Sequence, residues 1–250
     1  MLLTEYEYLV VAPGTAAYCD YLALRHEVFC EELKRVPSSG MCAKGMAIES
    51  DRYDIHSVHV LCRSREAGDA VGCSRLILPG PNGLNVSARY RMSQFGGVSR
   101  QQLGEIGRLT LSPRLRRSRG QMLESRRGGQ RFRRDGSMVA LGLYRELFHL
   151  AGQYGITHCL AAMEPSLARL LNRLGFPFVE AGPLNGDVVP ARQPYVVGAH
   201  AVRAALASRN VSVYDFIMSA DRTKSAAAEG GWGRSVIMPE VRREYLRLAV

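Results

Sequence analysis

Residues 105–111, which read EIGRLTL, are the stretch from which the rest of the sequence is best interpreted. Their alternation predicts a strand with two differently lined faces, and Pro113, which cannot donate to a central ladder, ends it near Ser112. Glu105 opens the strand, where a buried carboxylate is costly unless it has a partner or a chemical role. Arg108 is a candidate partner, although an offset of three residues places the two side chains on opposite faces of a regular strand. From this stretch alone, an ordinary acid at a strand end is an equally good interpretation.

The length and composition fit a globular protein. The chain has 250 residues, 46% of them hydrophobic, and no apolar run is long enough to span a bilayer. Its first eleven residues carry Glu5 and Glu7 and no basic residue, so we expect a first strand there and not a secretory signal. We expect one domain over residues 1–220 and an appendage over 221–250.

The cysteines indicate a reducing compartment. The six cysteines show no CxxC pair, so buried thiols in a cytoplasmic protein are expected, without a disulfide framework or a bound metal.

Arginine carries most of the net charge of +10, because lysine occurs only at positions 34, 44 and 224. Such a surface attracts polyanions, and composition leaves nucleic acid, an acidic carrier protein and anionic lipid headgroups all open. Nine arginines lie between residues 114 and 134, within an insertion over 112–136 that we expect to be a mobile excursion or a docking surface. Phe132 is its one aromatic residue, so it lacks the stacking side chains of a single-strand nucleic-acid binder.

The first half of the chain predicts a helix over 15–33 and an antiparallel hairpin of strands 57–64 and 70–79. Arg25 and Phe29 share a face of the helix, and Arg75 lies among apolar residues of the second strand, where a guanidinium needs an anion nearby. Three acids lie between the predicted helix and the predicted hairpin: Glu49, Asp51 and Asp54. They form either a solvated loop or a cation-binding pocket. They lack the DxDxDG pattern of a calcium loop, so no metal is expected.

Alternating helices and strands continue to about residue 220. The patterns predict helices over 137–154, 166–174 and 200–220, and strands over 156–163, 177–181 and 194–199. The predicted class is therefore a mixed α/β (α+β) fold with helices flanking one sheet.

This order of elements resembles the GCN5-related N-acetyltransferase (GNAT) fold over about residues 20–180. Within it, the chain is similar to the acyl-homoserine-lactone synthases and N-acyl amino acid synthases. The resemblance rests on eight positions in order: Arg25, Phe29, Glu49, Asp51, Asp54, Arg75, Glu105 and Arg108. It implies a mixed sheet whose fourth and fifth strands splay apart to admit the pantetheine arm of an acyl donor.

Two departures refine the resemblance. The lactone synthases carry a tryptophan soon after the position of Phe29, where this chain has none; its HEVFCEE motif and long arginine-rich insertion look more like exosortase-associated (PEP-CTERM system) acyltransferases. The turn that holds the pyrophosphate of coenzyme A in acetyl-CoA enzymes is also missing from PRLRRSRGQ. The resemblance therefore implies an acyl-phosphopantetheine donor on an acidic acyl carrier protein, with acyl-CoA still open, and carrier docking near Arg169 and Arg173.

The implied chemistry is transfer of a medium or long acyl chain to the amine of an amino acid or a similar small acceptor. Glu105 is the expected base, acting through a water, and the backbone N–H groups of Leu109 and Thr110 are expected to bind the oxyanion. The acids at 49, 51 and 54 either hold the acceptor's ammonium or fasten the three arginines of the motif in an ion-pair network. An autoinducer synthase using S-adenosylmethionine is the alternative function, and a basic nucleic-acid-binding protein is less favoured. No nucleic-acid partner is expected, and peripheral contact with a membrane stays open.

Overall fold

The computed structural model describes residues 5–93, 97–117, 126–219 and 224–225. Its strands form one sheet in the order β6-β7-β5-β4-β3-β2-β1-β8, and two-residue strands lie at both edges. The strands are β1 (Tyr6–Val11), β2 (Ser57–Ser64), β3 (Ala70–Ile77), β4 (Leu103–Leu111), β5 (His158–Met163), β6 (Val179–Glu180), β7 (Gln193–Gly198) and β8 (Lys224–Ser225). Among the strands of the described residues, only the β4–β5 and β1–β8 pairs are parallel. The sheet is therefore mixed, as the sequence predicts.

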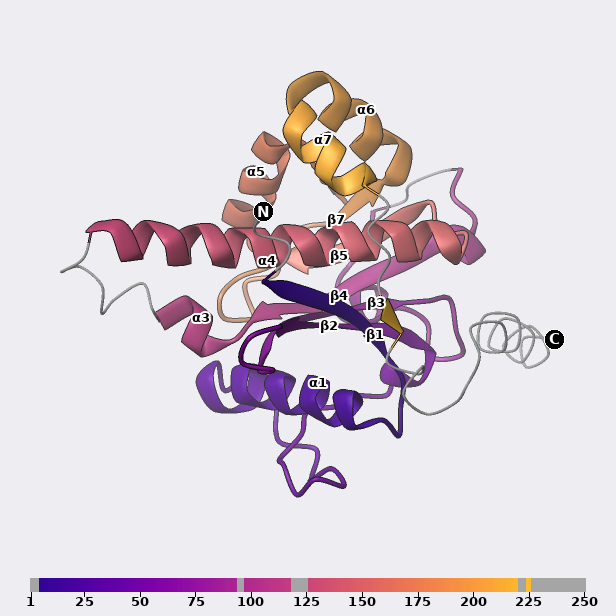
Figure 1. The fold of residues 1–250 in the computed structure, drawn as a ribbon. Coiled ribbons are helices and arrows are strands. Elements are labelled where there is room, and N and C mark those ends of the chain that lie inside the picture. Colours follow the sequence, from indigo (N-terminus) through magenta and orange to yellow (C-terminus); the bar gives the residue numbers. More distant parts are fainter. Residues whose placement is uncertain (1–4, 94–96, 118–125, 220–223, 226–250) are drawn as a thin grey trace.

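Helices cover both faces of the sheet. Figure 1 shows the long α4 (Arg126–Gln153) along one face and α1 (Ala16–His26) along the other. The remaining helical segments are η2 (Glu27–Glu32), η3 (Asp54–His56), α2 (Asn85–Arg89), η4 (Arg100–Gln102), α3 (Pro113–Arg117), α5 (Pro165–Leu174), α6 (Ala199–Arg209) and α7 (Val211–Met218). No helix in the described part of the chain has the length and apolar character needed to cross a membrane.

The two faces of the sheet bury separate apolar clusters. On the α4 face, Leu143 and Leu147 pack with Leu76 and Val60 of the central strands. On the α1 face, Leu22 and Val28 pack with strand residues such as Leu61. The strands alternate between these two cores, which is the physical origin of their period of two.

Several predicted boundaries are wrong. The helix expected over 137–154 begins at Arg126 and so includes part of the expected mobile insertion, because arginine is a good helix former and extending an existing helix costs little. The helix expected over 200–220 breaks at Asn210, whose side chain caps α7 by accepting from the N–H of Val213. The helix expected over 15–33 changes at Glu27 to a wider π-helical turn, and the strand expected over 177–181 has only two residues. Residues 118–125 of the insertion, and the expected appendage apart from 224–225, lie outside the described residues.

Candidate active site

Strands β4 and β5 separate after a short common ladder. Their parallel pairing covers Leu103 to Glu105 on β4 and His158 to Leu160 on β5, although β4 continues to Leu111 and β5 to Met163. The two strands therefore form the splay that the resemblance implies. Glu105 is the last residue of β4 that pairs with β5, so its carboxylate lies at the point of divergence.

Glu105 is buried, with 2% of its surface exposed. Its carboxylate accepts hydrogen bonds from the backbone N–H of Val86 (2.8 Å) and from the side-chain amide of Asn85 (3.2 Å), both on α2. Burial raises the pKa of Glu105, and these two hydrogen bonds only partly oppose the rise. A carboxylate with a raised pKa is a stronger base than an ordinary one, so the site can accept a proton from an amine or a water.

A bulge in β4 brings Arg108 to the same side of the sheet as Glu105. The β3–β4 register shifts between Cys73 and Arg75, and Arg108 takes a left-handed backbone conformation with φ of 52°. The sequence prediction that the side chains of Glu105 and Arg108 lie on opposite faces is therefore wrong. The extra residue of the bulge resets the alternation, and Arg108 then reaches the acids of the 49–54 segment.

Six charged side chains form a closed ring of alternating sign beside this bulge. Glu49 joins Arg25 (Nε–Oε2, 2.6 Å) to Arg108 (Nη2–Oε1, 2.8 Å). Asp51 joins Arg108 (Nη2–Oδ2, 3.0 Å) to Arg75 (Nη1–Oδ1, 2.7 Å).

Asp54 closes the ring, since its Oδ1 lies 2.6 Å from Nη1 of Arg75 and 2.7 Å from Nη1 of Arg25. Three cations and three anions make the ring neutral, so each acid already has two arginine partners. In the part of the chain that is described, no three His, Cys, Asp or Glu side chains gather to hold a metal ion.

The ring shifts the pKa values of its members in the directions that ion pairing requires. Burial disfavours the charged form of Asp54, but Arg25 and Arg75 outweigh it and hold its pKa well below the usual range. The pKa of Glu49 is lowered in the same way by Arg108 and Arg25, and that of Asp51 by Arg75 and Arg108. All three acids are therefore ionised at neutral pH.

The aromatic residue of the predicted set, Phe29, lies against the ring. Its side chain belongs to η2, and the guanidinium carbon of Arg108 lies 5.1 Å from the centre of its ring, in cation–π geometry. His59 is buried next to the charged ring, and its Nε2–H donates to the backbone oxygen of Asp54; burial lowers its pKa to about 4. His59 is thus neutral at pH 7.

An apolar cavity of about 50 Å³ lies on the α4 face next to the splay. Ile106 of β4 and Cys159 of β5 line it from the sheet, and Leu147 and Phe148 line it from α4. Pockets that hold drug-sized ligands usually measure about 300–1,000 Å³, so a long chain in this position requires side chains to rotate away. Charged groups and apolar space thus lie on opposite faces of the same splay.

The other predicted residues fall at the edges of the site. Leu109 of β4 lies in the bulge, and Thr110 pairs with Cys73 of β3 beyond it. Arg169 and Arg173 are exposed on α5, the helix that follows β5. Asn85 and Val86, which hold Glu105, were not predicted, because a short helix in a loop gives no periodic signal that would place it over a strand.

The fold is that of the GNAT acyltransferases, and the similarity to known proteins supports an acyltransferase. Residues 24–125 match the model of the acetyltransferase (GNAT) domain family. An acyl-homoserine-lactone synthase from Vibrio anguillarum is 25% identical over 186 residues, which cover 73% of this chain and 85% of that relative.

Solved structures of two kinds share the fold. One is a CoA-dependent acyl-homoserine lactone synthase, BjaI, with SAM and isopentyl-CoA; its TM-score is 0.61 at 18% identity, over 97% of this chain and 99% of that one. The other is FeeM, an N-acyl amino acid synthase from uncultured soil microbes; its TM-score is 0.52 at 12% identity, over 81% of this chain and 95% of that one.

Proposed function

We propose that the protein transfers a medium or long fatty acyl chain from a phosphopantetheine thioester to the amine of an amino acid or a similar small acceptor. The observation that carries the proposal is the buried Glu105 at the last paired position of β4 and β5. A thioester between the diverging strands would place its carbonyl near this carboxylate. The acyl chain would then enter the apolar cavity on the α4 face.

In this mechanism Glu105 accepts a proton from the acceptor's ammonium, directly or through a water. The neutral amine attacks the thioester carbonyl, and the backbone N–H of Leu109 in the bulge, or of Thr110 just after it, stabilises the oxyanion. Collapse of this intermediate breaks the C–S bond and releases the pantetheine sulfur as a thiolate, which takes up the proton that the attacking nitrogen loses. The products are an amide and a free thiol.

The charged ring has a positioning role in this proposal. Its six members neutralise one another, so they hold the bulge of β4 and the side chain of Phe29 in place. Deleting one partner of a buried ion pair typically costs about 3–5 kcal/mol, so such variants would lose folded protein before they lost a specific catalytic step.

The preferred donor is an acyl chain on an acidic acyl carrier protein. Arg169 and Arg173 are exposed on α5, beside the exposed Leu167 and Leu170. A surface that is both basic and apolar suits the binding of an acidic helix of a carrier protein. The arginine-rich insertion adds positive charge, and with the sequence resemblance it supports a place among exosortase-associated acyltransferases. All six cysteines are free, which supports a cytoplasmic location.

A second candidate function is synthesis of acyl-homoserine lactones, which the relative from Vibrio anguillarum favours. Mass spectrometry of lipid extracts from an expressing host separates the two, because N-acyl amino acids and acyl-homoserine lactones differ in their head groups. N-acyl amino acids support the proposal, lactones support the second candidate, and no acylated amine above the empty-vector level contradicts both.

The role of Glu105 is tested by substitution. We expect Glu105→Ala and Glu105→Gln to lower kcat/KM by about 10²–10⁴-fold, the usual contribution of a positioned base. Asn85→Ala is the matched control, because it removes a hydrogen bond to the same carboxylate and leaves the base in place. A folded Glu105→Gln protein with unchanged kcat/KM would remove Glu105 from the mechanism.

A further inference from the structure

A small space beside Gly107 is bordered by two polar groups of the site. Gly107 pairs with Arg75 across the β3–β4 ladder, and it lies two residues after Glu105 on the same strand, so all three share one face of the sheet. A Cβ atom at Gly107 would lie 3.4 Å from Nε of Arg75 and 4.0 Å from Oε1 of Glu105. A guanidinium nitrogen and a carboxylate oxygen therefore face the same place.

This space is open. Apart from Cγ of Arg75 at 3.8 Å, no other described atom outside residues 106–108 would lie closer than 4.0 Å to a Cβ at Gly107. The two neighbours in the chain are engaged elsewhere, because Ile106 lines the apolar cavity and the guanidinium of Arg108 binds Glu49. Gly107 itself is half-buried, so the space can be reached from outside the protein.

Both polar groups have unused hydrogen-bonding capacity. Nε of Arg75 is buried and has no hydrogen-bond partner among the described residues, although its Nη1 and Nη2 donate to Asp51 and Asp54. Each carboxylate oxygen of Glu105 accepts a single hydrogen bond, whereas a carboxylate can accept about four in all. Buried N–H groups in proteins almost always have a partner, so we expect a group in this space that accepts from Arg75.

The chemistry of the two groups decides what that occupant is. A guanidinium can only donate hydrogen bonds and an ionised carboxylate can only accept them, so the occupant must accept from Arg75 and donate to Glu105. An ammonium has no lone pair for Nε–H, and a thioester carbonyl has no proton for the carboxylate. A water molecule has both, and waters occupy polar spaces that offer two or more partners.

We propose that Arg75 is a positioning residue for proton transfer, because its Nε–H and Oε1 of Glu105 together hold a water beside Gly107 that relays the acceptor's proton. The inference rests on the proposed function, since it assigns the route of the proton in that reaction. The ammonium N–H bond breaks as its proton passes to the water, and an O–H proton of the water passes to Oε1 of Glu105. The water is regenerated, Arg75 keeps its charge, and the acceptor becomes a neutral amine.

The relay gives the charged ring a link to the chemistry. Arg75 binds Asp51 and Asp54 of the ring through Nη1, and its Nε–H fixes the water beside the base. The same guanidinium therefore sets the position of the water relative to the ring. Gly107 is the second positioning residue, because any other side chain begins with a Cβ atom in the place of the water.

A high-resolution crystal structure of the wild-type protein tests the water directly. We expect an ordered water within about 3.2 Å of both Nε of Arg75 and Oε1 of Glu105, and its loss in Gly107→Ala. We expect this variant to fold, because its Cβ would meet no described atom outside residues 106–108 closer than 3.4 Å and Gly107 has no positive φ. This measurement needs neither an acceptor nor turnover.

A second experiment compares two substitutions at Gly107. Thiol release from acyl-carrier protein and from acyl-CoA is measured with a mixture of the twenty standard amino acids, and with S-adenosylmethionine, as acceptors. Gly107→Ala should lower the rate at saturating donor by about 10- to 100-fold, less than the loss of the base itself because Glu105 remains. Gly107→Ser should retain much more activity, because its hydroxyl can accept from Arg75 and donate to Glu105 in place of the water.

Gly136→Ala is the matched control. It also adds one methyl group next to β4, but its Cβ would lie 3.6 Å from the side chain of Leu111, at the opposite end of the strand from Glu105. We expect its rate of thiol release to equal that of the wild type. Thermal melts verify that each variant is folded.

The outcomes separate the inference from the proposed function. If the wild type acylates no amine, the proposed function fails and the relay with it, whereas the crystal structure still decides whether the water is bound. A wild-type structure without this water, full activity in folded Gly107→Ala, or equal losses in the alanine and serine variants overturns the relay and leaves the acyltransferase proposal standing. If Gly107→Ala does not fold, the wild-type crystal structure alone decides.

Discussion

Substituting Asp54 by asparagine tests whether the charged ring holds the site together. Asp54 accepts from Arg25 and Arg75 through Oδ1 and from the backbone N–H of Asp51 through Oδ2. Asparagine has nearly the same shape but removes one negative charge, which leaves three guanidiniums against two carboxylates. Breaking a buried ion pair in this way typically costs about 3–5 kcal/mol.

The cost is large for a domain of this size. Marginal stabilities are about 5–15 kcal/mol, and 1 kcal/mol corresponds to about 2–4 °C in Tm for a domain of 150–250 residues. We therefore expect Asp54→Asn to lower Tm by about 6–20 °C at pH 7, as measured by circular dichroism. Asp69→Asn is the control, because Asp69 pairs with Arg114 on the surface, where ion pairs contribute about 1 kcal/mol or less.

A double variant and a pH series sharpen this test. Arg25→Met with Asp54→Asn restores a neutral ring, so we expect its loss of stability to be smaller than the sum of the two single losses. The pKa of Asp54 is depressed in the folded protein, so its stabilising effect is complete above its unfolded pKa of about 3.9 and is lost as pH falls below that value. The Tm gap between wild type and Asp54→Asn should therefore narrow in acid. A gap no larger than that of Asp69→Asn at pH 7 would refute the reasoning.

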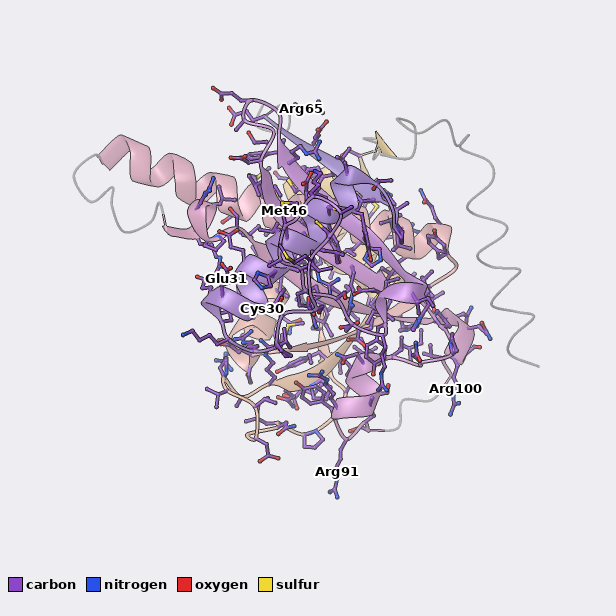
Figure 2. The ribbon with its side chains drawn as sticks, turned by 90° about the horizontal axis from the view of Figure 1, so that it is seen from below. Cys30, Glu31, Met46, Arg65, Arg91 and Arg100 are labelled. Carbon is purple, nitrogen blue, oxygen red and sulfur yellow. The ribbon has the colours of Figure 1, made fainter. Side chains whose placement is uncertain are left out.

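Three further predictions concern catalysis, donor binding and packing. Burial raises the pKa of Glu105, so we expect the acid limb of the pH profile of kcat/KM to have an apparent pKa above the ordinary glutamate value of about 4.3. An apparent pKa at or below that value argues against Glu105 as the base. Charge reversal at Arg169 and Arg173 together should raise KM for acyl-carrier protein but not for acyl-CoA. The control Arg100→Glu, at an exposed position (Figure 2), should change neither KM. Equal effects on both donors would contradict carrier docking at Arg169 and Arg173. In α4, Gly142→Ala should cost about 1–3 kcal/mol in urea unfolding, since its Cβ would lie 2.0 Å from the Tyr8 hydroxyl, whereas Gly152→Ala meets no atom within 4 Å and should be neutral or stabilising.

The sequence by itself determined the order and type of most elements, and through them the class of fold. The periodicity of β2, β3 and β5 and of the second half of α4 is strong because each buries one or both faces against a core. The eight motif positions also came from the sequence, since their spacing is preserved by the elements that carry them. Boundaries such as the start of α4 at Arg126 were missed, because polar residues extend a helix without a periodic signal.

Only the tertiary structure decided how the charged groups combine. A regular strand places Glu105 and Arg108 on opposite faces, and the bulge that reverses this depends on pairing with β3, which lies about thirty residues away in sequence. The closed ring and the support of Glu105 by α2 both join segments that are distant along the chain. Coulomb interactions and burial act through space, so sequence spacing supplies the charges, and the fold decides which of them become partners.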